Sequence, residues 1–340
     1  MNAISNQPPG RQEIKGLSDG QSIEEVYLVT DKQLRSNRNG NPYIQVELCD
    51  RSGSITGRQW NADEGRFRSF EVGDYLQIQG KVQLFQGSLQ IIVNRMEKMA
   101  PDTVDLAQFL PHTTKNVGQM VERLNILLRS LENHHLRALA ECFLMDHTLM
   151  SGFARAPAGV RQHHAYIGGL LEHVVTQMEV ADRLVPFYGG LNRDLFLLGI
   201  FLHDIGKVRE LSYDGPFSYS DEGQLVGHIV IGVFILEEKA RLAEKLTGEA
   251  FPVELLLRLK HIIVSHHGTL EFGSPVVPMT PEAIAVHHLD NLDAKLNIFT
   301  RKIQESSNDS SSWTNYDPSL NRRLFKGRKE GPAPLEDADE

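Results

Sequence analysis

The sequence predicts a multidomain α+β protein in which a small five-stranded β-barrel precedes an all-α helical bundle. Apolar residues alternate with a period of two between residues 22 and 98, which is the pattern of half-buried strands. From residue 117 onward they recur at helical spacing instead. The chain of 340 residues is long enough for two or three domains, each with its own core.

The barrel is expected over residues 21–100. The stretch "PYIQVELCD" places Ile44, Val46 and Leu48 on one face and polar residues on the other. The turn "RSGS" and the strand "SITGRQW" follow, and then "NADEGRFRSF" interrupts the pattern before two more strands that join at residues 85–88. Five strands with an interruption between the third and the fourth are typical of an oligonucleotide-binding (OB) barrel. A small β-barrel without a ligand is the alternative.

Helical periodicity begins with "NVGQMVERLNILLRSLEN", whose apolar stripe fits a core or an interface equally well. Further helical segments are expected at 134–151, 161–186, 192–210, 224–247, 251–266 and 280–303. The predicted organisation is a flexible leader at 1–20, the barrel at 21–100, a linker at 101–116, a helical domain at 117–305 and a mostly flexible tail at 306–340. The tail is rich in Ser, Asp and Pro.

Composition limits the class of protein. No run of about 18 apolar residues is present, so no membrane span is expected. The first 16 residues lack an apolar signal core, and the only cysteines are Cys49 and Cys142, so the sequence predicts a cytoplasmic protein without a disulfide framework. The net charge of -9 lies outside residues 1–100, which hold equal numbers of acidic and basic side chains. This charge neither supports nor excludes a polyanionic substrate.

Histidines are concentrated in the helical region. Ten of the 14 lie between residues 163 and 288, and several interrupt apolar helices, as His203 does in "GIFLHDIGKVREL". Burial of imidazoles and carboxylates is costly unless they are paired or bound to a metal. A single histidine of this kind is more often a satisfied core residue, but five on successive helices, with Asp290 and Asp293, favour a metal site inside a bundle. Mixed imidazole and carboxylate ligands suit Mn, Fe, Co, Ni or Zn better than Ca or Mg.

Four stretches in this order resemble the HD-domain metallophosphohydrolases in their two-metal form: "HHAYIGGLLEHVV", "FLHDIGKVREL", "GHIVIG" and "SHHGTLEFGSPVVPMTPEAIAVHHLDNLDAK". Together with the OB-like N-terminal region, they resemble the YhaM-type 3'-5' exoribonucleases of bacteria, from about residue 22 to about residue 300. The resemblance implies an OB barrel followed by an HD domain. It also implies an oligomer and a metal-dependent, manganese-favouring enzyme of RNA processing that degrades single-stranded RNA, and sometimes single-stranded DNA, from the 3' end.

The resemblance also implies ligands for two divalent cations. The first ion would be held by His173, His203, Asp204 and Asp290. His228 and His266 would complete the second, with Asp204 bridging the two ions. His267 is expected either to replace His266 or to contact the substrate. His261, His287 and His288 are expected to be structural, with His287 as an outer support of the ligands, and Glu172 either orients a ligand or lies on the surface.

The expected mechanism is attack by a metal-activated water on the terminal phosphodiester, which would release nucleoside 5'-monophosphates. Asp204, Lys207 and His267 are the expected catalytic residues, and Lys207 would also neutralise a phosphate oxygen. The alternative for Lys207 is a solvated lysine at a helix end. His163 and His164 are expected either to contact phosphate or to form a polar helix start. On the barrel, the candidate contacts for single-stranded RNA are Tyr43, Arg58, Trp60, Lys81 and Phe85.

Two other functions compete with the exonuclease. One is a phosphohydrolase of nucleotides or cyclic dinucleotides in which the barrel is a regulatory module, because an HD site alone does not fix the substrate. The other is a nucleic-acid-binding protein with a purely structural metal. The surplus of His and Lys around the expected ligands argues against a closed structural site.

Overall fold

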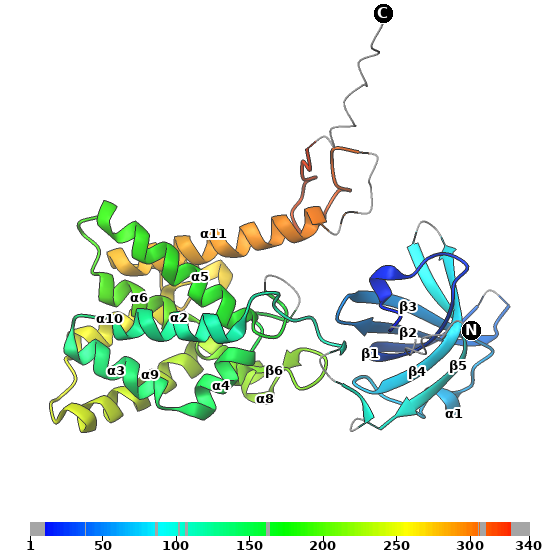
Figure 1. The fold of residues 1–340 in the computed structure, drawn as a ribbon, viewed down its shortest axis with the longest axis horizontal. Helices are drawn as coiled ribbons and strands as arrows, with labels where there is room; N and C mark the ends of the chain where they lie inside the picture. The colour runs from blue at the N-terminus through cyan, green and yellow to red at the C-terminus, as the bar shows by residue number, and fades with distance from the viewer. Residues whose placement is uncertain are drawn as a thin grey trace, which may run out of the picture.

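The computed structural model describes residues 11–37, 39–85, 88–100, 103–105, 108–160, 164–304, 306 and 311–327. It confirms the predicted fold class, because five strands form a closed barrel and a helical region follows (Figure 1). The barrel strands are β1 (Ser22–Ser36), β2 (Pro42–Asp50), β3 (Gly53–Trp60), β4 (Tyr75–Phe85) and β5 (Ser88–Met99). The short helix α1 (Glu64–Phe67) lies between β3 and β4, where the interruption of the strand pattern was predicted.

The strands pair in the order β1-β2-β3-β5-β4, and pairing between β1 and β4 closes the barrel. All pairs are antiparallel except β3 with β5. The alternation in β2 is observed as predicted, since Ile44, Val46 and Leu48 are fully buried in the barrel core. This burial fixes the register of β2, because a slip of one residue would turn every apolar side chain outward.

The predicted flexible leader is wrong for residues 11–20. Ile14 and Leu17 are buried in the barrel core on either side of a short 3-10 turn. The backbone N–H of Ile14 donates to the carboxylate of Asp50 at 2.8 Å. Residues 1–10 lie outside the described residues. A short apolar pair in a polar segment is enough to bind that segment to the barrel.

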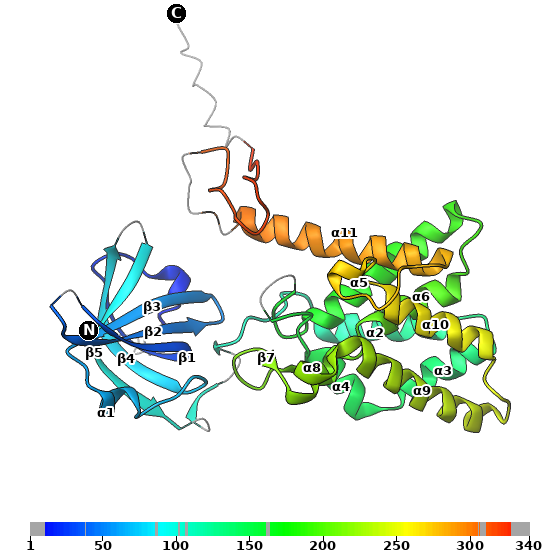
Figure 2. The same ribbon diagram turned by 180° about the vertical axis from the view of Figure 1, so that it is seen from behind.

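The expected linker at 101–116 contains packed residues between the two domains. Phe109 and Leu110 are buried together with Leu28 and Tyr75 of the barrel. Phe217, from the loop between β6 (Leu211–Ser212) and β7 (Ser218–Tyr219), packs against the same cluster. Figures 1 and 2 show this loop and the linker in the space between the barrel and the helices. A cleft of about 620 Å³ lies there, and Arg51 and Arg301 are among the residues that line it.

The helical domain has one large apolar core. Its helices are α2 (Val117–Arg129), α3 (His134–Leu144), α4 (His147–Arg155), α5 (Gly169–Leu184), α6 (Arg193–His203), α7 (Lys207–Glu210), α8 (Asp221–Leu225), α9 (Gly227–Thr247), α10 (Val253–Ser265) and α11 (Pro281–Gln304). The apolar stripe of α2, which the sequence assigned to either a core or an interface, belongs to this core, since Leu124, Leu127 and Leu128 are buried. Among the described residues, the helices do not include one of the length and apolarity that a membrane span requires.

The expected flexible tail is wrong for residues 311–327, which we call the tail hairpin. Its two sides meet at the bridges Trp313–Phe325 and Asp317–Arg322. An ion pair of 2.6 Å between Lys302 and Asp317 fastens it to the end of α11. Residues 328–340 lie outside the described residues.

Candidate metal centre

Five helices bring the predicted ligands to one place in the helical core. His173 comes from α5, and His203 is the last residue of α6, so Asp204 directly follows that helix. His228 comes from the start of α9, and His266 follows the end of α10. Asp290 lies on α11, and together these side chains surround Asp204, which is 2% exposed. The adjacency of His203 and Asp204 therefore marks the point where an apolar helix ends inside the core.

The turn after Asp204 depends on a glycine. A Cβ atom on Gly206 would lie 2.0 Å from the backbone oxygen of His228, closer than any side chain allows. Because the chain has no side chain at this position, the Asp204 turn can lie directly against the start of α9. The close approach of two backbones therefore brings His228 within reach of Asp204.

The two carboxylate oxygens of Asp204 face different sets of histidines. Its Oδ2 atom lies 3.8 Å from His173 Nε2 and 3.5 Å from His203 Nε2. Its Oδ1 atom lies 3.6 Å from both His228 Nε2 and His266 Nε2. This is the arrangement that a carboxylate needs to bridge two cations, one beside each oxygen.

Asp290 belongs to the first of these sets. Its Oδ1 atom lies 3.1 Å from His173 Nε2 and 3.7 Å from His203 Nε2. Two ligand atoms that each lie about 2.1 Å from one ion are separated by about 3.0–3.4 Å in tetrahedral or octahedral geometry. The observed separations are close to these values.

Several of the converging atoms are buried without a hydrogen-bond partner among the described residues. They are His203 Nε2, Asp204 Oδ1, His228 Nε2 and His266 Nε2. A buried polar atom without a partner costs about 1–3 kcal/mol, so three imidazole nitrogens and one carboxylate oxygen left in this way are not expected from packing alone. Cations bound on the two sides of Asp204 would satisfy all four atoms. The donor set therefore fits divalent metal ions.

The Nδ1 atoms of these histidines make hydrogen bonds that fix which tautomer each ring adopts. His203 Nδ1 and His266 Nδ1 donate to the backbone oxygens of Ile200 and Ile263, at 2.6 and 2.8 Å. Because a carbonyl oxygen can only accept, Nδ1 carries the proton and Nε2 presents a lone pair toward Asp204. His228 Nδ1 bonds Glu210 Oε1 at 2.9 Å in the same way. These contacts orient the imidazoles and raise their basicity as ligands.

Asp293 plays the equivalent part for His173. Its Oδ2 atom accepts from His173 Nδ1 at 2.7 Å and from His164 Nε2 at 2.8 Å. The other face of His173 lies against Gln177, whose Nε2 atom is 2.8 Å from His173 Nε2. Sequence reasoning noted Asp293 without a role and missed Glu210 and Gln177. Gln177 lies one helical turn after His173, a signal that was available, whereas Glu210 lies 18 positions before His228 and the sequence between them gives no such signal.

The charges favour ionised acids at the centre, whereas the imidazoles differ from one another. Burial alone would raise the pKa of Asp204, but Lys207 and the surrounding histidines hold it well below its usual range. Burial likewise opposes the charge of Asp290, and the adjacent His173 and His203 hold its pKa far below normal. Burial lowers the pKa of His266, which keeps its ring neutral near pH 7. Burial opposes the charge of His173, but Asp290 and Asp293 raise its pKa to about 9, so a cation bound there would have to displace a proton from this ring. The ionised carboxylates and the neutral His266 ring are in the states that bind metals.

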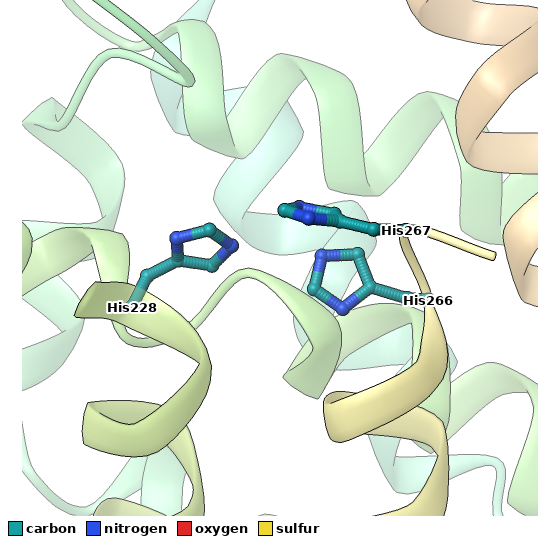
Figure 3. Close-up of side chains that lie close together, drawn as sticks. All are labelled: His228, His266 and His267. Carbon is teal, nitrogen blue, oxygen red and sulfur yellow. The ribbon is translucent and has the colours of Figure 1, made fainter. Parts of the chain in front are cut away.

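Lys207 and His267 lie at the same centre. The Nζ atom of Lys207 donates to Asp204 Oδ2 at 2.6 Å, and Lys207 is 9% exposed. The His267 ring lies 5.2 Å from that of His228 and 4.3 Å from that of His266. Figure 3 shows the three rings turned toward one space, His228 from α9 and the other two from the end of α10. The structure thus brings both His266 and His267 to His228, where the sequence left a choice between them.

The remaining candidates near the centre have other contacts. Both ring nitrogens of His164 are engaged, Nδ1 with Tyr166 Oη at 2.7 Å and Nε2 with Asp293, so it lies behind His173 rather than toward a substrate. His163 lies outside the described residues. Glu172 bonds Thr113 and Lys115 instead of orienting a ligand.

The histidines expected to be structural are also placed. His287 Nδ1 bonds the backbone oxygen of His266 at 2.8 Å, as an outer support. His261 Nε2 accepts from the backbone N–H of Met279. His288 lines a separate apolar pocket with Leu184 and Tyr188.

Four of the five barrel candidates form two contacting pairs on the outer face of β2, β3 and β4. The rings of Tyr43 and Trp60 are 4.8 Å apart, and the guanidinium of Arg58 lies 5.5 Å from the centre of the Phe85 ring. Trp60 and Phe85 are 42% and 45% exposed. Lys81 of β4 and Arg58 of β3 both pair with Ile92 of β5, which lies between them. The hairpins β1–β2 and β4–β5 that flank this surface are those through which OB barrels bind oligonucleotides.

Comparisons with known proteins agree with both domains. Residues 170–295 match the family described as "HD domain", and residues 28–99 match "OB-fold nucleic acid binding domain". The chain is 30% identical to the "3'-5' exoribonuclease YhaM" of Listeria innocua over 84% of this chain and 90% of that protein. It is also 30% identical to the protein of that name from Bacillus subtilis, over 84% of this chain and 88% of that protein.

Among solved structures, the second OB-fold domain of replication protein A from Methanococcus maripaludis covers 26% of this chain and 94% of that domain. The identity is 24% and the TM-score is 0.22.

Proposed function

Because the chain belongs to the family of YhaM 3'-5' exoribonucleases, we propose that it shortens single-stranded RNA from the 3' end at the centre around Asp204. The HD domain makes it a metal-dependent hydrolase that uses divalent cations. The observation that supports the assignment to this centre is the group of buried ligand atoms without partners around Asp204, in a chain whose barrel also displays the exposed rings of Trp60 and Phe85.

We propose two ions, with manganese preferred and iron, cobalt, nickel or zinc as alternatives. His173, His203, Asp290 and Asp204 Oδ2 would hold the first, because their facing atoms lie 3.1–3.8 Å apart. His228, His266 and Asp204 Oδ1 would hold the second, with His267 beside them. When bound, such ions lower the pKa of a coordinated water and neutralise phosphate oxygens.

The protein's own residues would position the reaction. Asp204 is kept ionised and shared between both sets, while Glu210 and Asp293 fix the orientation of the imidazoles. Lys207 sits beside Asp204 with its ammonium in the centre, where it would attract a non-bridging phosphate oxygen. Hydrolysis would break the terminal P–O bond to the 3' oxygen of the preceding nucleotide. The products would be a nucleoside 5'-monophosphate and an RNA with a new 3'-hydroxyl.

The barrel would hold the strand while its end reacts. Trp60 is exposed and contacts the half-buried Tyr43, and Arg58 and Lys81 would provide charge on the same side of the barrel. Stacking of one base on an aromatic side chain contributes about 1–3 kcal/mol and tolerates every base. This surface would accept single-stranded RNA of any sequence, and single-stranded DNA as a second substrate.

Three further expectations accompany this function. The two cysteines are free, which agrees with the proposed cytoplasmic location. We also propose that the protein forms an oligomer, as the family resemblance implies. We propose likewise that the barrel binds the RNA and that the helical domain hydrolyses it.

The test is degradation of a 5'-labelled single-stranded RNA with Mn²⁺. The wild-type protein should produce a ladder that shortens from the 3' end, and Asp204→Ala should abolish it. Trp60→Ala should slow RNA degradation while it leaves hydrolysis of a small phosphodiester unchanged. Equal effects of Trp60→Ala on both substrates, or intact RNA with metal-loaded wild-type protein, would favour a phosphohydrolase of small nucleotides.

A further inference from the structure

The tail hairpin is an ordered structure whose apolar rings face outward. The backbone N–H of Thr314 donates to the oxygen of Leu324 at 2.9 Å, and these two residues are buried. Their neighbours Trp313 and Phe325 point the other way, with ring centres 5.1 Å apart. They are 46% and 57% exposed. The hairpin therefore keeps its small core on one side and displays an aromatic pair on the other.

The charge of the tail hairpin differs from that of the whole chain. The chain carries a net charge of -9, yet the only acid among residues 311–327 is Asp317, which is paired with Lys302. Arg322 and Arg323 are exposed on the same hairpin, and Lys326 follows the aromatic pair. An exposed aromatic pair beside several cations is the chemistry that binds bases and phosphates of a single strand.

The same combination occurs on the barrel. Trp60 and Trp313 are the only tryptophans of the chain, and each contacts a second ring that is also accessible. Arg58 accompanies the first pair, as Arg322 and Arg323 accompany the second. The two surfaces lie on different domains, so each would have to bind a separate part of one strand.

Helix α11 places the tail hairpin in relation to the metal centre. It carries Asp290 and Asp293 at the centre, Arg301 at the cleft between the domains, and Lys302 at the hairpin. Lys302 lies nine positions after Asp293, which corresponds to about 14 Å along a helix. Figures 1 and 2 show the hairpin at the end of α11 that lies toward the barrel.

We propose that the tail hairpin is a second binding surface for single-stranded RNA. A base stacks on Trp313 and Phe325, and Arg322 and Arg323 contact the phosphates beside it. The hairpin holds the strand on the 5' side of the nucleotide being removed. This inference rests on the proposed exonuclease function, because it takes RNA as the substrate.

The two tryptophans allow a direct test. In Trp60→Phe the only tryptophan is Trp313, and in Trp313→Phe it is Trp60. A 20-nucleotide single-stranded RNA is titrated into each variant with EDTA present, which prevents cleavage, and binding is followed in parallel by the anisotropy of labelled RNA. Quenching of Trp313 fluorescence along the binding curve supports the proposal. Saturated binding by anisotropy with unchanged Trp313 emission overturns it.

Charge reversal gives an independent measurement. Arg323→Glu should weaken RNA binding about five- to tenfold and raise KM for long RNA, with kcat for a small phosphodiester unchanged. Lys245→Glu is the matched control, because Lys245 is an exposed cation on α9, away from α11. Trp313→Ala should weaken RNA binding, and Trp313→Tyr should restore most of it.

The outcomes separate this inference from the proposed function. If wild-type protein degrades RNA and Arg323→Glu behaves like Lys245→Glu, the hairpin inference is wrong and the exonuclease function stands. If wild-type protein leaves RNA intact but the hairpin variants still weaken binding, the function is wrong and the surface is right. If Arg323→Glu changes the molecular mass in solution and RNA binding follows only that change, the surface contacts a second copy of the chain.

Discussion

Substitution of Glu210 by Gln should weaken metal binding without unfolding the protein. Glu210 is 7% exposed and accepts from both the Nδ1 atom and the backbone N–H of His228, at 2.9 and 2.8 Å. Glutamine retains a carbonyl oxygen for these bonds but loses the negative charge that makes the imidazole a stronger donor to a cation. Loss of such outer partners typically costs 10- to 100-fold in metal affinity, or about 1.4–2.7 kcal/mol.

The assay is titration of Mn²⁺ against RNA degradation and against metal content after dialysis. Glu210→Gln should shift the activation constant by about one to two orders of magnitude, with activity largely restored at high Mn²⁺. Glu222→Gln is the control, because Glu222 lies nearby in α8 but pairs on the surface with Arg209. An activation constant within twofold of wild type, or an equal shift in the control, would refute the role assigned to Glu210.

Three more expectations concern stability and reactivity. Asp146→Ala should lower the free energy of unfolding by about 2–3 kcal/mol in urea titrations, because Asp146 caps α4 and pairs with buried Lys239. Its hydrogen bonds hold the pKa of Asp146 below its ordinary value. The stabilisation by Asp146 is therefore present above about pH 4 and is lost as pH falls through the lowered pKa. Equal losses of stability by the mutant and the wild type on acidification would contradict this role of Asp146. Gly206→Ala should lower both the melting temperature and metal content, since a Cβ would collide with the backbone of His228, and an unchanged melting temperature would show that the turn adapts. Burial and nearby Asp50 raise the pKa of the Cys49 thiol to about 12, so iodoacetamide at pH 8 should label it only after denaturation, as mass spectrometry would show.

The metal centre could be predicted from the sequence because its residues conflict with their surroundings. His203 and Asp204 end an apolar helix, and no packing argument explains them there. The residues that orient the ligands are not anomalous in this way. Glu210 is an ordinary polar residue in sequence, and the expected role of His164 was a phosphate contact or a helix start. Only the fold shows that Glu210 supports His228 and that His164 contacts Asp293.

The barrel and the termini show the same contrast. Strict alternation in β2 predicted which side chains are buried, because the strand has one inner face. The leader and the tail were predicted as flexible because they are polar on average. Ile14 and Leu17 pack on the barrel, and Lys302 fastens the tail hairpin through Asp317. Such docking involves a few residues and another part of the chain, so average composition does not register it.

The continuity of α11 gives this protein a length scale. A helix is stiff, and it sets about 14 Å between the residue that supports the first ligand set and the residue that fastens the hairpin. With a rise of about 3.4 Å per stacked nucleotide, that span corresponds to roughly four nucleotides. Under the proposal that the tail hairpin binds RNA, oligonucleotides shorter than this span along α11 would no longer reach the aromatic rings while their 3' end is at the metal centre. The enzyme would then degrade the last few nucleotides of each RNA more slowly than the rest.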